Sequence, residues 1–331
     1  MRVPVKLGTT LTSYLLKNRL ASRDKFPLVL MIEPTHLCNL SCKGCGRIIE
    51  YSDNSDLLSV EECIGAAKEC DAPVVTVTGG EPLLHPQIDE IVKGLVNMGR
   101  YVYLCTNGLM LTDTLDRLEP NSHFYINVHI DGLEHTHDVI TSHEGSFRQA
   151  TEAIKKAKGL GFRVCTNTTL YLDSKPEEIE ELFIYLEGIG VDGMLVSPGF
   201  SFVHNTDDIF LTREQIQKRF GFIYELSKKH RLLNTPLYLK FLTGQKELKC
   251  TPWGNPTRNT LGWKSPCYMI TDKHYPTYKE LMENTDWEYY RSGKDPRCKN
   301  CMMHCGFEAS VITEGVKSIS DMLEMAKWSF G

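Results

Sequence analysis

Short apolar runs alternate with amphipathic segments along most of the chain. Six runs rich in Val, Leu, Ile and Tyr predict buried strands at Leu28–Glu33, Val74–Thr78, Tyr101–Leu104, Phe124–Ile130, Arg163–Leu170 and Met194–Ser197. Helical spacing of apolar residues predicts helices between them at Val60–Cys70, Gln87–Met98, Phe147–Leu160 and Pro176–Glu187. Because repeated strand–helix units form parallel sheets with right-handed crossovers, we expect an α/β protein with an open barrel or a doubly wound sheet.

Both ends of the chain depart from this alternation. Residues 1–26 are basic, with leucines near helical spacing, which predicts an amphipathic helix. That helix could pack on the barrel with a solvated basic face, or lie on an anionic membrane surface. After Thr243 the pattern changes to loops, with a last helix expected at Ser318–Ser329. We therefore expect an N-terminal helix at 1–26, a barrel at 27–243, and a cysteine-rich domain with a C-terminal helix at 244–331.

Length and composition are those of an ordinary globular chain. The sequence has 331 residues, of which 41% are hydrophobic and 24% charged. A net charge of −5 gives no reason to expect nucleic acid as a partner. No apolar stretch reaches the roughly 20 residues of a membrane span, and no secretory signal is visible, so we expect a cytoplasmic protein.

Cysteine is unusually frequent, with twelve in the chain. Eight of them fall into two groups. The first cysteine group is Cys38, Cys42 and Cys45, and the second cysteine group is Cys250, Cys267, Cys298, Cys301 and Cys305. In a reducing compartment, clustered thiols are more often ligands of zinc or of iron–sulfur clusters than partners in disulfides.

Polar residues and glycines follow each predicted strand. The carboxyl ends of the strands carry the active site in an α/β barrel, so six such ends on one rim predict a site. The residues in question are Cys38, Cys42 and Cys45; Gly79, Gly80, Glu81 and Pro82; Cys105, Thr106 and Asn107; His129 and Asp131; Asn167 and Thr169; and Ser197 and Pro198.

The first cysteine group has the spacing Cys-x3-Cys-x2-Cys. Three thiolates can hold three irons of an iron–sulfur cubane and leave the fourth iron for a ligand from outside the protein. An open coordination position is a feature of catalytic metal sites. A zinc ion completed by His36 is the alternative, and it is less favoured because structural zinc ligands usually come as two pairs.

This cysteine spacing, followed after the next strand by Gly79-Gly80-Glu81-Pro82, resembles the radical S-adenosylmethionine superfamily over about Leu28 to Ser197. The resemblance implies a partial (β/α)6 barrel and a [4Fe-4S] cluster on the first cysteine group, with S-adenosylmethionine on its open iron. It also implies an external one-electron reductant such as flavodoxin or ferredoxin, which drives cleavage to a 5′-deoxyadenosyl radical. The residues expected to contact S-adenosylmethionine are Gly79, Gly80, Glu81, Pro82, Thr106, Asn107, His129, Asp131, Asn167, Thr169, Ser197 and Pro198.

Two positions depart from the pattern of that superfamily. Gly44, just before the third cysteine, stands where the superfamily often has an aromatic residue. His129 stands where a small hydroxyl residue is common. The first departure bears on packing under the adenine and not on the cluster.

The second cysteine group resembles the shortened auxiliary-cluster domains of radical enzymes. Eleven residues separate Cys250 from Gly262, four more precede Cys267, and Cys298-x2-Cys301 follows later. The resemblance implies a second [4Fe-4S] cluster on Cys250, Cys267, Cys298 and Cys301, with Cys305 left over. Zinc accepts four thiolates equally well, so both metals stay open.

Longer stretches resemble one branch of the superfamily, the adenosylhopene transferases of bacterial hopanoid biosynthesis. They include residues 79–85, 250–259 and 304–306. This resemblance implies that S-adenosylmethionine is a co-substrate, whose 5′-deoxyadenosyl group is added to the alkene of hopene (diploptene) to give adenosylhopane. A lipid substrate favours a peripheral position of the N-terminal helix on the inner face of the membrane.

Radical addition to an alkene leaves a tertiary carbon radical that must gain a hydrogen atom. Cys105 stands at a strand end outside both cysteine groups, and we take it as the candidate catalytic donor. A buried cysteine that merely fills space is the alternative of equal weight. For the whole protein, the alternatives are a radical enzyme that modifies a peptide and an iron–sulfur electron carrier without catalysis.

Overall fold

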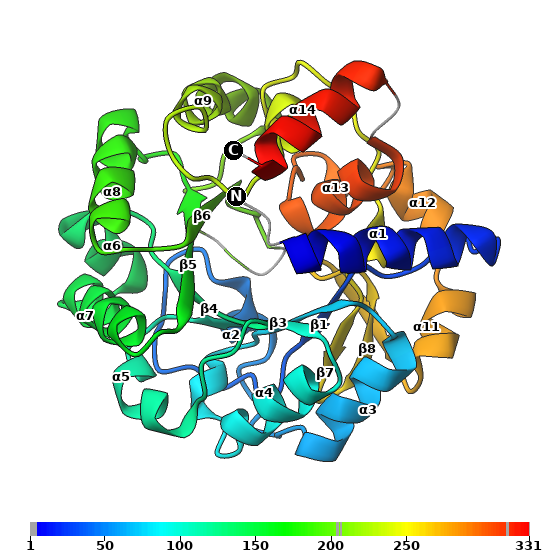
Figure 1. Ribbon diagram of the computed structural model, residues 1–331, viewed down its shortest axis with the longest axis horizontal. Helices are drawn as coiled ribbons and strands as arrows, with labels where there is room; N and C mark the ends of the chain where they lie inside the picture. Colours follow the sequence, from blue (N-terminus) through cyan, green and yellow to red (C-terminus); the bar gives the residue numbers. More distant parts are fainter. Residues whose placement is uncertain (1–4, 203–204, 206, 316–317, 331) are drawn as a thin grey trace.

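A nine-stranded mixed sheet forms the centre of the molecule. The computed structural model describes residues 5–202, 205, 207–315 and 318–330 (Figure 1). The strand order is β6-β5-β4-β3-β2-β1-β7-β8-β9, and the first six strands along the chain are mutually parallel. They are β1 (Val29–Ile32), β2 (Val74–Val77), β3 (Tyr101–Thr106), β4 (Phe124–His129), β5 (Arg163–Leu170) and β6 (Gly193–Pro198).

The order of these six strands decides between the two predicted architectures. Strands β1 to β6 follow one another across the sheet without a reversal, whereas a doubly wound sheet has a point at which the order reverses. The connecting helices therefore lie outside a barrel-like sheet that stays open, as Figure 1 shows. The fold is α/β, as predicted. These helices are α2 (Gly46–Glu50), α3 (Val60–Cys70), α4 (Ile88–Asn97), α5 (Leu111–Thr114), α6 (Glu134–Thr141), α7 (Ser146–Gly159) and α8 (Pro176–Gly188).

The core lies between the sheet and these helices. Leu30 and Val75 of neighbouring strands are completely buried, as is Ile91 of α4. Helix α3 begins with a capping box, in which Ser59 accepts a hydrogen bond from Glu62 N and Ser59 N donates to the Glu62 carboxylate. Its buried face includes Cys63 and Cys70, which are core residues outside both cysteine groups.

The N-terminal helix α1 (Val5–Leu20) packs against the amino ends of the parallel strands, opposite to the first cysteine group. Leu7 is buried and contacts a cluster that includes Val74 and Tyr101, the first residues of their strands. Leu16 and Leu20, in contrast, are exposed. Among the described residues, no helix has the length and apolar character required to cross a membrane.

The C-terminal segment extends the same sheet. Strand β7 (Thr257–Asn259) pairs with β1 in parallel, and the antiparallel strands β8 (Gly262–Pro266) and β9 (Thr271–Tyr275) continue from it. Trp253 and Trp263 belong to the main core shared with the parallel strands. The remaining helices are α9 (Arg213–Leu226), α10 (Pro236–Leu242), α11 (Tyr278–Asn284), α12 (Trp287–Arg291), α13 (His304–Ser310) and α14 (Ile319–Phe330).

Candidate active site

The first cysteine group lies in the loop after β1, at the carboxyl ends of the parallel strands. All three of its thiols are partly buried. Backbone hydrogen bonds fix this loop to the rim, because Lys43 N donates to Ile140 O at 2.7 Å and Gly44 N donates to Asp207 Oδ2 at 2.6 Å. The centre of the loop is therefore held by α6, through Ile140, and by the segment between β6 and α9, through Asp207.

Gly44 explains one departure from the superfamily pattern. Its φ of +76° is left-handed, a conformation that favours glycine. A Cβ at this position would lie 3.2 Å from the Phe210 ring and 3.3 Å from the Tyr171 ring. Aromatic rings from elsewhere in the chain thus fill the space where an aromatic side chain is common.

The electrostatics of the first cysteine group suit a cationic centre. Burial raises the pKa of the Cys38 thiol to about 11 and that of Cys42 above its ordinary range, and neighbouring thiols add to both shifts. Three thiolates this close would repel one another unless positive charge lies among them. The donor set and its burial therefore fit an iron–sulfur cluster.

The turn after β2 passes very close to the cysteine loop. A Cβ on Gly79 would collide with Thr35 O, and a Cβ on Gly80 would collide with Leu37 O. Gly79 also has a φ of +124°. Only glycine allows the two backbones to approach in this way.

Glu81 fastens this turn to the end of β3. Its buried carboxylate accepts hydrogen bonds from Leu83 N at 3.0 Å, Thr106 Oγ1 at 2.8 Å and Asn107 N at 2.8 Å. The Asn107 side chain in turn donates to Asn39 Oδ1, next to the first cysteine. Burial raises the pKa of Glu81 to about 7 despite these bonds. The predicted residues at these two strand ends therefore position the cysteine loop, while Pro82 begins a buried 3-10 turn, η1 (Pro82–Leu84).

The ends of β4 and β5 are joined by His129 and Asp131. The His129 Nε2–Asp131 Oδ2 distance is 2.7 Å, and Asp131 Oδ1 accepts from Thr169 N at 2.7 Å. Burial opposes the charge of His129, but the Asp131 carboxylate raises the pKa of the imidazole and its own pKa is lowered. Asn167 Nδ2 lies 3.2 Å from His129 Nδ1. Its Oδ1 is buried and has no hydrogen-bond partner among the described residues, which fits a polar ligand at this rim.

Strand register brings the other predicted residues to the same edge. Thr169 pairs with Ser197, and His129 pairs with Asn167. Pro198 ends β6 opposite Leu170. The predicted contacts for S-adenosylmethionine thus line adjacent strand ends, and their roles stay predictions.

Cys105 lies one residue before the end of β3. Its Sγ accepts a hydrogen bond from Asn127 Nδ2 at 3.4 Å. Burial raises the pKa of the Cys105 thiol to about 11, so the sulfur keeps its proton at neutral pH. It belongs to neither cysteine group.

The second cysteine group comes together from distant parts of the chain. Cys305 is buried with Phe200, Met269 and Met303, and the sulfurs of three further cysteines pack against that cluster. Gly306 leaves room for the Cys250 thiol, because a Cβ there would lie 2.5 Å from Cys250 Sγ. The pKa of Cys250 is raised well above its ordinary value by burial and then by the other four thiols. All five cysteines therefore share one region. Cys305 is among them, although the sequence analysis did not include it among the four predicted ligands.

Comparisons with known proteins agree with this geometry. Residues 32–186 match the model of the Radical SAM superfamily. This half of the chain is therefore a radical S-adenosylmethionine domain. Residues 194–325 match a second model, described as a domain of unknown function (DUF3463). A [4Fe-4S] cluster and S-adenosylmethionine are the cofactors that this superfamily implies, and the first cysteine group fits them.

Individual relatives of this radical S-adenosylmethionine protein have various names. An AdoMet-dependent heme synthase of Methanosarcina barkeri is 29% identical over 82% of this chain and 85% of its own length. A GTP 3′,8-cyclase of Aquifex aeolicus is 27% identical over 61% of this chain and 67% of its own length. The chain spans about half the length of several other curated relatives that it matches. The adenosylhopene transferase assignment therefore stays a prediction.

Among solved structures, Streptococcus suis SuiB bound to the precursor peptide SuiA matches with a TM-score of 0.66. The match has 15% identity and covers 91% of this chain and 75% of SuiB. At that identity the likeness concerns the fold. The shared fold extends beyond the parallel strands.

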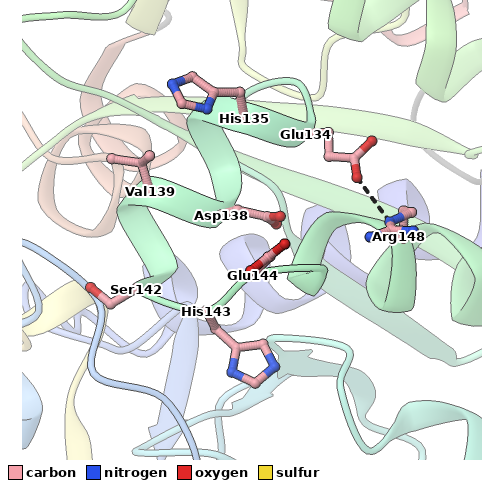
Figure 2. Close-up of a pocket in the computed structure, with 8 residues that line it drawn as sticks. All are labelled: Glu134, His135, Asp138, Val139, Ser142, His143, Glu144 and Arg148. Carbon is pink, nitrogen blue, oxygen red and sulfur yellow. Dashed lines mark ion pairs between the residues drawn. The ribbon is translucent and has the colours of Figure 1, made fainter.

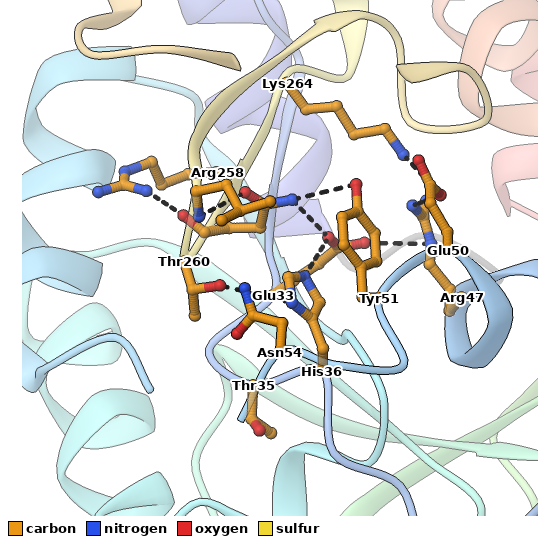
Figure 3. A network of polar contacts seen from close by, with 12 residues as sticks. Glu33, Thr35, His36, Arg47, Glu50, Tyr51, Asn54, Arg258, Thr260 and Lys264 are labelled. Carbon is orange, nitrogen blue, oxygen red and sulfur yellow. Dashed lines mark hydrogen bonds and ion pairs between the residues drawn. The ribbon is translucent and has the colours of Figure 1, made fainter. Parts of the chain in front are cut away.

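Sequence reasoning missed a buried polar network beside the cysteine loop (Figure 3). Glu33 is completely buried, and its Oε1 lies 3.2 Å from Arg47 Nε. His36 stacks on Tyr51 with ring centroids 4.0 Å apart, so it belongs to this network and not to the thiols. Lys264 joins from β8, and burial lowers its pKa to about 8. The network joins residues 33–54 to residues 258–264, which lie far away in the chain, and these residues form no motif that the sequence analysis could use.

A surface depression of about 580 Å³ lies over α6 and α7 (Figure 2). An ion pair between Glu134 Oε1 and Arg148 Nε, 2.8 Å apart, crosses it. None of the residues predicted for the site lines this depression. It therefore gives no candidate substrate pocket.

Proposed function

We propose that this radical S-adenosylmethionine enzyme adds the 5′-deoxyadenosyl group to the alkene of hopene (diploptene) and forms adenosylhopane in hopanoid biosynthesis. The resemblance of several stretches to adenosylhopene transferases supports this substrate. The single observation that carries the chemistry is the position of Cys105, a free thiol at a strand end of the site.

The first cysteine group holds the cluster in this proposal. When bound, the cluster supplies the electron, taken from an external reductant such as flavodoxin or ferredoxin, that splits S-adenosylmethionine. Asp131, Asn167 and Thr169 orient its ribose and carboxylate, and the Ser197–Pro198 strand end lies along its adenine. The bonds of Glu81 keep the Gly79–Gly80 turn against the cysteine loop.

Cys105 completes the reaction in this proposal. Addition to the alkene leaves one unpaired electron on a tertiary carbon of the lipid. Transfer of the Cys105 hydrogen atom saturates that carbon and leaves the unpaired electron on sulfur, which the external one-electron donor and a proton then restore. The transfer is favourable because an S–H bond is weaker than the C–H bond that forms. Burial supports this role because it keeps the proton on the thiol.

A buried apolar cluster lies beside the second cysteine group. Phe200, Met269, Ile270 and Met303 are buried together, and Phe202 packs against them. A triterpene buries a large apolar area, so its pocket must be mostly apolar. This apolar cluster supports a lipid substrate. Trp253 and Trp263 of the C-terminal segment, in contrast, belong to the main core.

A second [4Fe-4S] cluster on Cys250, Cys267, Cys298 and Cys301 belongs to the proposal. The resemblance of this segment to auxiliary-cluster domains supports that cluster. Zinc accepts four thiolates equally well, so iron and sulfide counts per chain distinguish the two metals.

The test is an anaerobic reaction of the purified protein with dithionite, S-adenosylmethionine and diploptene, followed by mass spectrometry. We expect a product with the mass of adenosylhopane, and no product from the Cys42→Ala variant. Formation of 5′-deoxyadenosine without any lipid adduct would remove hopene as substrate and favour a peptide-modifying enzyme. Absence of 5′-deoxyadenosine would favour the electron carrier.

A further inference from the structure

Arg47 lies between the two cysteine groups and contacts a residue next to each. It follows Cys45 by two positions, and its guanidinium donates a hydrogen bond to the carbonyl of Tyr268. The guanidinium carbon also lies 4.3 Å from the centre of the Tyr268 ring. Tyr268 directly follows Cys267 in the chain. One buried side chain thus joins the end of the first cysteine loop to the second cysteine group.

Two carboxylates hold Arg47 in place, and a second cation, Lys264, shares two of its partners. Arg47 Nε lies 3.2 Å from Glu33 Oε1, and Arg47 NH1 lies 3.4 Å from Glu50 Oε2. Lys264 Nζ lies 3.7 Å from the same Glu50 oxygen and donates to Tyr268 O at 2.9 Å. Two cationic donors therefore converge on a single carbonyl, as part of the network in Figure 3.

This network contacts the first cysteine loop at both ends. Glu33 immediately follows β1 and precedes the loop, and Arg47 follows it on α2. Lys264 and Tyr268 flank Cys267 in the same way. A buried charge pair contributes little to stability compared with apolar packing, so its value lies in fixing one arrangement of the groups that it joins.

We propose that Arg47 is a positioning residue that couples the two cysteine groups, so that metal loading of the second group stabilises the cluster of the first. Loading fixes Cys267 and with it the Tyr268 carbonyl. That carbonyl fixes Arg47, and Arg47 fixes the loop that carries Cys45. Coupling between two sites is a free energy, and it acts equally in both directions. The inference rests on metal at both groups, as in the proposed function, and is independent of hopene.

A double-mutant cycle tests this coupling. The measured quantity is the rate at which an iron chelator removes the first cluster under anaerobic conditions, followed by the electron paramagnetic resonance signal that responds to S-adenosylmethionine. We expect Cys301→Ser to speed this loss by about fivefold or more. In the Arg47→Gln background the same Cys301→Ser change should accelerate cluster loss little, because the contact between residue 47 and the Tyr268 carbonyl is already lost. Equal acceleration in both backgrounds would overturn the coupling.

Arg100 offers a matched control. It too donates to a backbone carbonyl, Ala72 O at 3.1 Å, and to a carboxylate, Asp71 Oδ1 at 2.8 Å. Because it contacts neither cysteine group, Arg100→Gln and Cys301→Ser should act independently. A cycle with Arg100 as strong as that with Arg47 would show general loosening and overturn the proposal.

Arg47→Lys replaces Arg47→Gln in the cycle if the latter does not fold. Lysine keeps the charge but loses the planar fork that stacks on the ring and binds several oxygens at once. We expect it to retain at most part of the coupling, so that Cys301→Ser accelerates cluster loss less in this background than in the native chain. Full coupling with Lys would overturn the role of the guanidinium. A first cluster that never forms would overturn both this inference and the proposed function, whereas a stable cluster with additive variants would overturn this inference alone.

Discussion

Thr106 Oγ1 donates a hydrogen bond of 2.8 Å to Glu81 Oε1, which ties the carboxyl end of β3 to the turn after β2. Both side chains are buried. Glu81 also accepts from the backbone of Asn107, whose side chain reaches the cysteine loop. One carboxylate therefore organises three neighbouring segments of the candidate site.

Glu81 should make stability depend on pH. Its pKa is about 7 in the folded protein and near 4.5 when unfolded, because burial disfavours the charge. The folded state then binds the proton more tightly, so the contribution of Glu81 to the free energy of unfolding falls as pH rises from about 4.5 to about 7. The loss amounts to up to about 3 kcal/mol.

Urea unfolding of the metal-free protein at several pH values measures this contribution. The difference between the native chain and Glu81→Gln isolates it, since Gln does not titrate. We expect the difference in the free energy of unfolding between the two proteins to change between about pH 4.5 and pH 7. Parallel stability curves for the two proteins would contradict the raised pKa.

The Gly80 turn should tolerate no side chain. Gly80→Ala places a Cβ against Leu37 O, and we expect a loss of about 1–3 kcal/mol together with reduced iron content. Gly65→Ala in α3 is the control, because a Cβ there meets nothing within 4 Å, and helix propensity predicts a gain of about 0.5–1 kcal/mol. Chemical unfolding and iron analysis of both variants check the contrast. A Gly80→Ala protein with native stability would show that the two backbones can move apart.

Cys105→Ala should separate radical formation from product quenching. We expect 5′-deoxyadenosine formation to continue while saturated adenosylhopane falls at least about tenfold, because the hydrogen atom would then have to come from a donor that is not positioned at the radical. Cys63→Ala is the control, since Cys63 is a completely buried cysteine of α3 that belongs to neither cysteine group. Unchanged yield and stereochemistry with Cys105→Ala would leave that thiol a packing residue.

Helix α1 should contribute to binding of anionic membranes. Leu16 is 54% and Leu20 86% exposed, and Lys17 and Arg19 lie beside them, whereas Leu7 is buried in the protein. Replacing Leu16 and Leu20 with Gln should lower flotation with phosphatidylserine vesicles and leave unfolding unchanged. Equal flotation of the double variant would favour a helix whose only role is packing.

Periodicity predicted the parallel strands because strands buried on both faces need continuous apolar runs. The predicted strand Phe124–Ile130, for example, differs from β4 by one residue. The short strands β7 to β9 were missed because their alternation is brief and Lys264, at the centre of β8, is a buried charge. Motif spacing placed the strand-end residues together, whereas Arg47 and Glu33 could be linked only by their distance in space.

Iron analysis with electron paramagnetic resonance, on an anaerobic protein that carries Cys298→Ser and Cys301→Ser, tests the central claim most directly. These changes remove two ligands of the second cysteine group and leave the three thiols of the first in place. We predict about four irons per chain and a reduced-cluster signal that shifts when S-adenosylmethionine is added, both abolished by Cys42→Ala. A protein without iron, or a signal indifferent to S-adenosylmethionine, would contradict a three-cysteine cluster with an open iron.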